Sequence, residues 1–99
     1  MTVQDLKRYR SEDGRESVRG TLATQIVPAQ RTATLFAAFC PPFEHLPQVH
    51  AHAAGRTASV KVAQILHNGV QLEVRLASEA KTNQVVTVEF IATELRAAS

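Results

Sequence analysis

The chain has 99 residues, which is enough for one small domain with a single core. Its apolar share of 44% is ordinary for a globular protein, and a net charge of +2 is too small to indicate nucleic acid as a partner. A single cysteine, Cys40, excludes an intrachain disulfide. No apolar run has membrane-spanning length, and the first residues are too charged for a secretory signal. We therefore expect no membrane insertion, and the compartment stays open, with a virion or a non-classical release route among the alternatives.

Residues 1–19 differ in composition from the rest of the chain, because acidic and basic side chains are mixed there at high density. They predict a polar N-terminal arm ahead of a domain over residues 20–99. Two fates are open for the arm, a solvated tail and a segment that lies across a neighbouring subunit. Binding to a phosphate backbone is disfavoured, because the acids offset the bases.

From Thr21 onward the pattern is that of β-strands. Apolar and polar residues alternate with period two, and turn residues separate the runs. Asn68-Gly69 predicts a tight hairpin turn built on two positive φ angles. The sequence thus predicts an all-β fold, a six-stranded antiparallel β-sandwich. The expected strands are 21–27, 31–39, 48–54, 58–66, 70–77 and 84–94.

The alternating runs also predict which residues are buried. The expected core comprises Val70, Leu72, Val74, Leu76, Val86, Val88 and Phe90, and Phe36 and Phe43 are expected to join it. The opposite strand faces are expected to carry small or apolar side chains at Ala37, Ala51, Ala53, Ala63, Ile65 and Ile91. A monomer rarely exposes so much apolar surface, so these residues predict a subunit interface.

A series of short motifs runs in a characteristic order along residues 31–94. They are Phe36, Pro42-Phe43, Pro47-Gln48-Val49, the strand Val60–Leu66, Asn68-Gly69-Val70 and Val86–Ala92. In this order they resemble the H-type lectin domain and the related receptor-binding tips of phage tail fibres. The resemblance implies a six-stranded sandwich that assembles as a homotrimer and binds carbohydrate near the subunit boundaries.

The sugar-binding residues of that family carry over only in part. Arg56 lies about where the family has a sugar-contacting arginine. The loop over residues 78–83, however, lacks the aromatic residue and the histidine that hold galactose-type sugars in its animal members. Galactose specificity is therefore not expected.

Polar loop residues are the predicted recognition site. Carboxylate, amide and cationic groups around a shallow cleft are suited to sugar hydroxyls. The candidate carbohydrate-binding residues are Arg56, Asn68, Glu79, Lys81 and Asn83. The alternative interpretation of the same residues is an ordinary solvated hairpin loop.

His50 and His52 lie two apart on a predicted strand, so both imidazoles point to the same face. One pair gives half of a metal site, whereas three pairs on a trimer axis would give six nitrogens, a set suited to octahedral iron, nickel or cobalt. The alternative is two histidines without metal, and His45 and His67 are expected to be plain surface residues. No other cofactor is expected.

Catalytic motifs are lacking. The sequence contains no serine-centred elbow, no phosphate-binding glycine loop and no HExxH motif. We therefore expect a non-enzymatic, multivalent carbohydrate- or receptor-binding module whose partner is a cell-surface glycan or receptor. The alternative function is a structural subunit of a phage or secreted assembly.

Overall fold

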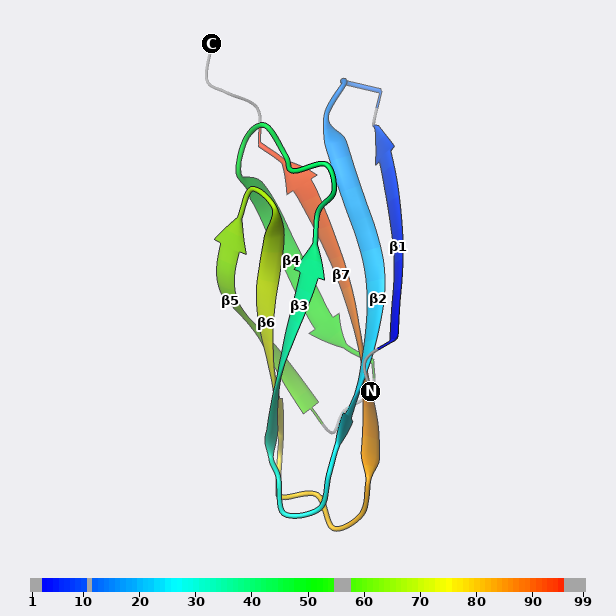
Figure 1. The fold of residues 1–99 in the computed structure, drawn as a ribbon, viewed down its shortest axis with the longest axis vertical. Helices are drawn as coiled ribbons and strands as arrows, with labels where there is room; N and C mark the ends of the chain where they lie inside the picture. The colour runs from blue at the N-terminus through cyan, green and yellow to red at the C-terminus, as the bar shows by residue number, and fades with distance from the viewer. Residues whose placement is uncertain (1–2, 11, 55–57, 96–99) are drawn as a thin grey trace.

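The computed structural model describes residues 3–10, 12–54 and 58–95, which form seven β-strands and no helix (Figure 1). The strands are β1 (Val3–Arg10), β2 (Glu16–Ile26), β3 (Thr32–Ala38), β4 (Pro47–Ala53), β5 (Ala58–Leu66), β6 (Gly69–Leu76) and β7 (Gln84–Glu94). This part of the chain accordingly offers no helix of the length and apolarity needed to cross a membrane.

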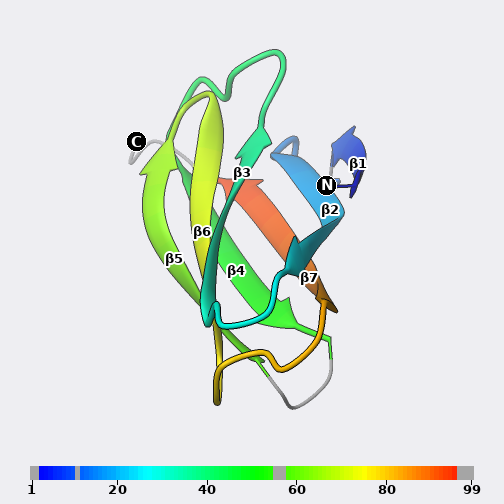
Figure 2. The ribbon, with the colours of Figure 1, turned by 60° about the horizontal axis from the view of Figure 1, so that its bottom comes forward.

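The strands form two antiparallel sheets that pack face to face (Figure 2). The four-stranded sheet has the order β1-β2-β7-β4, and the three-stranded sheet has the order β3-β6-β5. The core between them is apolar and includes the rings of Phe39, Phe43 and Phe90, with Phe39 and Phe43 centred 4.9 Å apart. The fold is thus an all-β, two-sheet sandwich.

The six predicted strands all occur, with ends that differ by only a few residues except at β2, which begins five residues earlier than expected. The seventh strand, β1, lies inside the segment expected to be a polar arm. Residues 3–10 pair with β2 along their whole length, from Val3 opposite Ala23 to Arg10 opposite Glu16. In the described residues this segment is therefore the outer strand of a hairpin, and a count of six strands was one too few.

Arg8 holds β1 against the rest of the sandwich. Its guanidinium pairs with Glu16 on β2 and donates to the carbonyl of Pro41 at 2.5 Å. It also lies 4.9 Å from the centre of the Phe43 ring, within range for a cation–π contact. A charged side chain thus covers the core at this edge, at an inward position where an apolar residue would be usual.

The predicted core is confirmed for the seven residues from Val70 to Phe90, all of which are 4% exposed or less. Phe43 is also buried, but Phe36 is 46% exposed and points outward from β3. The predicted interface is corrected. Ala37 is completely buried, and Ala51, Ala53 and Ile65 pack against the core from within. This leaves only Ala63 and Ile91 of that set on outer faces.

The turn between β5 and β6 also differs from the prediction. Leu66 pairs with Gly69, so the two loop residues are His67 and Asn68. Neither Asn68 nor Gly69 has a positive φ. Gly69 is needed for a different reason: a Cβ there would lie 2.3 Å from Cζ of Phe36 and 2.8 Å from the backbone oxygen of Ala37. The glycine leaves room for the Phe36 ring and the backbone of β3, and it is not one of the two loop residues.

Candidate functional site

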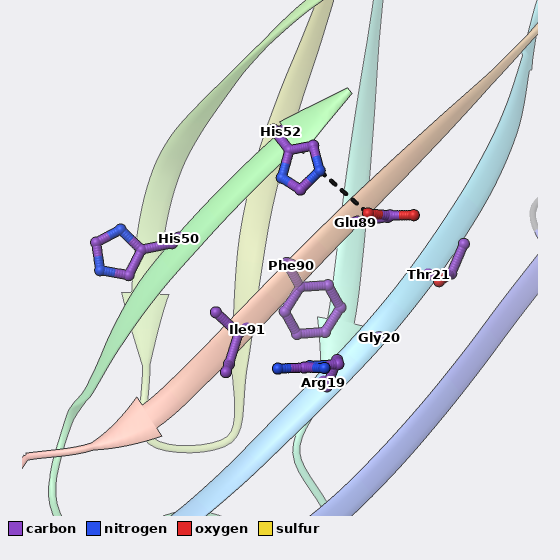
Figure 3. Close-up of a pocket in the computed structure, with 8 residues that line it drawn as sticks. All are labelled: Arg19, Gly20, Thr21, His50, His52, Glu89, Phe90 and Ile91. Carbon is purple, nitrogen blue, oxygen red and sulfur yellow. Dashed lines mark hydrogen bonds and ion pairs between the residues drawn. The ribbon is translucent and has the colours of Figure 1, made fainter. Parts of the chain in front are cut away.

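A shallow cleft of about 390 Å³ lies on the outer face of the four-stranded sheet (Figure 3). Three neighbouring strands supply its lining residues. These are Arg19, Gly20 and Thr21 on β2, Glu89, Phe90 and Ile91 on β7, and His50 and His52 on β4. The volume falls in the range of small-molecule sites.

Strand register explains why the polar side chains gather. Ile91 stands opposite both Arg19 and His50, so these three form one row across the sheet. Glu89 stands opposite both Thr21 and His52, which form the next row. Residues two apart on a strand share a face, so both rows present their side chains to solvent.

The polar groups of the cleft are only partly engaged with one another. His52 Nε2 and Glu89 Oε2 lie 3.1 Å apart, and Figure 3 shows this contact as the dashed line. Arg19 is exposed, and within the described residues its guanidinium makes no ion pair. The cleft therefore holds one carboxylate that already contacts a histidine of the same chain and one guanidinium that is available to a ligand.

The middle of the cleft is apolar. Ile91 is half-buried on β7, between the polar residues of β2 and β4, and forms the apolar floor. Gly20 and Phe90 also line the cleft, but the ring of Phe90 belongs to the core on the inner side of the sheet. A Cβ on Gly20 would lie 2.6 Å from Cε1 of Phe90, so the ring packs against β2 on the inner side of the sheet. A ligand here would meet an apolar floor edged by a guanidinium, two imidazoles and a carboxylate.

The histidine prediction is confirmed in geometry: His50 and His52 both project from the outer face of β4 (Figure 3). Their metal role stays a prediction. Among residues 3–10, 12–54 and 58–95, no group of three histidine, cysteine or acidic side chains is placed to hold a metal ion. Of the other histidines, His67 Nδ1 lies 3.0 Å from the Phe43 carbonyl, and the amide of His45 donates to Glu94.

Three of the predicted carbohydrate-binding residues lie on one loop. Glu79, Lys81 and Asn83 are exposed in the connection from β6 to β7. This connection runs beside the β2–β3 connection at the same end of the sandwich (Figure 1), and Ala80 joins the two through hydrogen bonds with Ala29 and Gln30, each 2.9 Å. These three side chains therefore share one end of the molecule.

The other two predicted residues do not join them. Asn68 lies in the β5–β6 turn at the opposite end (Figure 1), separated from the β6–β7 loop by the eight residues of β6, or about 25 Å. Its carbonyl accepts a hydrogen bond from the amide of Phe39, which is a structural role. Arg56 lies outside the described residues. A single small-molecule site cannot include both Asn68 and the 79–83 loop.

The cleft residues Arg19, Thr21 and Glu89 were missed from the sequence as site residues. Each is simply an outward-facing polar residue of an alternating strand. Only the strand order β2-β7-β4 brings them beside the histidine pair. Comparison with protein-family models, with curated proteins and with solved structures finds no match for this chain.

Proposed function

We propose that this chain is a non-catalytic recognition module of the lectin type, and that it binds a glycan or a glycosylated receptor in the cleft on β2, β7 and β4. The observation that carries the proposal is the composition of that cleft. Planar polar groups from three strands surround a small apolar floor in a volume of about 390 Å³. Sugars have the complementary character, with hydroxyls at their edges and apolar faces.

Arg19 is the proposed anchoring residue. Its guanidinium has five N–H donors in a fixed geometry and is available in the cleft, whereas Glu89 already contacts His52. Lys7 stands opposite Arg19 on β1 and adds a second positive charge at this side of the cleft. On the same face of β1, Asp5 stands opposite Thr21 and offsets that charge, so it is the guanidinium of Arg19, unpaired within the described residues, that favours a glycan with an acidic group.

The arrangement supports binding rather than catalysis. Glu89 is the sole carboxylate among the eight lining residues, so the cleft has no carboxylate pair of the kind that glycoside hydrolysis uses. The outer face of a sheet is also open to water, which weakens the electrostatic stabilisation that catalysis requires.

A glycan array followed by calorimetric titration tests the proposal. Arg19→Ala is expected to weaken binding of the best glycan at least tenfold, because the anchoring guanidinium is lost. Arg75→Ala is the matched control, since Arg75 is an exposed arginine on the outer face of the other sheet. Silence across neutral and acidic glycans from a folded protein would overturn the proposal.

The alternative, a structural subunit of an assembly, gains one specific argument from the hairpin of β1 and β2. Residues 3–10 extend the sheet, and no strand of the described part of the chain pairs with their outer edge, which a neighbour could therefore contact. Deleting residues 1–19 would remove part of β2, including the buried Val18, so the sharper truncation removes only residues 1–10. A folded truncated protein that keeps glycan binding but loses a co-purifying partner would favour this alternative.

A further inference from the structure

Strand β1 forms one edge of the four-stranded sheet. Among the described residues it pairs with β2 on one side, and no strand pairs with it on the other. An edge strand presents backbone N–H and C=O groups that can continue the ladder with another strand. The edge covers the eight residues Val3–Arg10, which is long enough for a regular antiparallel pair.

The sequence of β1 is complementary to itself in one antiparallel register. In an antiparallel pair of strands, residues directly opposite each other point to the same face of the sheet. If a two-fold axis perpendicular to the sheet relates two copies of β1, this condition is met only when the axis passes beside one residue, which then lies opposite the same residue of the other copy. The register is said to be centred on that residue. Centred on Leu6, it places Asp5 of each copy opposite Lys7 of the other. Opposite charges at directly opposed positions stabilise a strand pair.

The neighbouring registers lack this complementarity. A register centred on Asp5 opposes two aspartates, one centred on Lys7 opposes two lysines, and one centred on Arg8 opposes two arginines. Like charges directly opposite each other destabilise a strand pair. The charges of β1 therefore select the register centred on Leu6.

A charge in the single chain supports the same register. Lys7 stands directly opposite Arg19 on β2, which is a pair of like charges on the outer face. With Leu6 at the centre, Asp5 of the second copy lies on the free side of Lys7. The row then reads Arg19, Lys7 and Asp5 of the second copy, and the added carboxylate offsets the repulsion within each chain.

We propose that a second copy of this chain pairs with β1 in the register centred on Leu6, forming a two-fold dimer with a continuous eight-stranded sheet. The β7 strands of the two copies are then five strand spacings apart, so the two clefts lie on one face about 24 Å from each other. Use of that spacing for bivalent binding rests on the proposed glycan function, whereas the dimer does not.

Light scattering over a concentration series tests the dimer through charge reversal. The wild-type protein is expected at twice the 10.8 kDa mass of one chain. Asp5→Lys and Lys7→Asp, each alone, are expected to weaken association at least tenfold, because each makes two like-charge pairs. Both positions are exposed, so the fold is expected to persist, as circular dichroism will show. Glu73→Lys, on the outer face of the other sheet, is the matched control and should leave the mass unchanged.

Two rescue experiments identify the register. The two single variants, when mixed, oppose only unlike charges and are expected to form a heterodimer. The double variant Asp5→Lys with Lys7→Asp reverses both charges within each chain and is expected to regain the wild-type dimer. A monomeric wild type, a trimer unaffected by either reversal, or folded variants that fail to rescue would overturn the dimer.

The dimer and the glycan site fail independently of each other. Arg19→Ala is expected to stay dimeric while it loses ligand. Asp5→Lys adds positive charge beside the cleft, so it is expected to bind a soluble monovalent glycan at least as tightly as wild type. It is nevertheless expected to lose at least tenfold in apparent affinity for a surface that displays many copies, because bivalent attachment is lost. If that surface retains Asp5→Lys as well as it retains the wild-type protein, the bivalent role is overturned and the dimer itself is not.

Discussion

Gly20 of β2 and Phe90 of β7 stand opposite each other in the four-stranded sheet, and the Phe90 ring occupies the space that a side chain at Gly20 would need. A Cβ on Gly20 would lie 2.6 Å from Cε1 of Phe90 and 2.3 Å from Cδ2 of Leu6. The glycine thus allows the ring to pack under the floor of the cleft. It also leaves room for the side chain of Leu6 on β1, which packs against Gly20 from the other side.

Gly20→Ala is therefore expected to destabilise the fold. The added methyl group must displace a buried ring, and overpacking of this kind costs about 1–3 kcal/mol. Chemical denaturation measures the change in the free energy of unfolding. Gln25→Ala, at an exposed position on the same strand, is the control and should change stability by less than about 0.5 kcal/mol. Equal effects of the two substitutions would contradict the close-packing argument.

The sequence predicts the central strands of this fold well because their burial follows simple alternation. β6 has Val70, Leu72, Val74 and Leu76 buried, with the residues between them more exposed. β1 lacks that signal, since its inward position Arg8 is charged and covers the core through Phe43 and Glu16. With a cation at an inward position, the sequence of β1 loses the alternation of apolar and polar residues and resembles that of a polar tail.

The candidate site is less predictable from sequence than the fold. His50 and His52 are two apart on one strand, so their common face follows directly from strand geometry. Arg19 and Glu89 join them only because β7 lies between β2 and β4, and the order of strands in a sheet is a long-range property. The separation of Asn68 from the 79–83 loop, by contrast, can be predicted from the sequence, because a turn and a loop that flank one strand necessarily lie at opposite ends of that strand.

The β1–β2 hairpin is expected to loosen in acid. Hydrogen bonds from Arg8, and secondarily from Arg10, lower the pKa of Glu16 below its ordinary value. A carboxyl group whose pKa is lowered on folding stabilises the fold above its unfolded pKa, and this contribution is lost as pH falls through the folded pKa. Thermal unfolding measured between about pH 2 and 7 should therefore show a stability loss below about pH 4.

Glu16→Gln tests the source of that acid sensitivity. It removes the titrating group, so the variant is expected to be less stable than wild type at neutral pH and to lose less on acidification. Glu12→Gln, in the same hairpin but exposed, is the matched control and should keep the wild-type pH profile. If both variants show the wild-type profile, the acid response originates elsewhere.

Ala29 offers a way to stabilise the protein. Its φ of 71° lies in the left-handed region, which is strained for alanine, and its amide donates to Ala80 at 2.9 Å. Ala29→Gly relieves the strain but increases the freedom of the unfolded chain, so a net gain of about 0.5 kcal/mol is expected. Ala38→Gly, on β3 with an ordinary φ, should instead destabilise by about 0.5–1 kcal/mol. Denaturation midpoints that shift in the same direction would contradict the strain argument.

Arg31 braces the end of the sandwich that carries the predicted loop site. Its Nε donates to the carbonyl of Leu76 at 2.9 Å, and its Nη2 donates to the carbonyl of Ala77 at 3.0 Å. Arg31→Ala is expected to cost about 1 kcal/mol and to speed hydrogen exchange at the amide of Ala80, which donates to Gln30. Arg31→Lys keeps the charge but loses the paired geometry, and should restore little protection.

The same variant separates the two candidate ligand sites. The cleft on β2, β7 and β4 does not include Arg31, so glycan binding there should survive Arg31→Ala. Binding at the loop of Glu79, Lys81 and Asn83 should weaken, because the start of that loop loses the two hydrogen bonds that Arg31 donates. A titration in which Arg31→Ala and Asn83→Ala reduce affinity while Arg19→Ala does not would therefore move the site from the sheet to the loop.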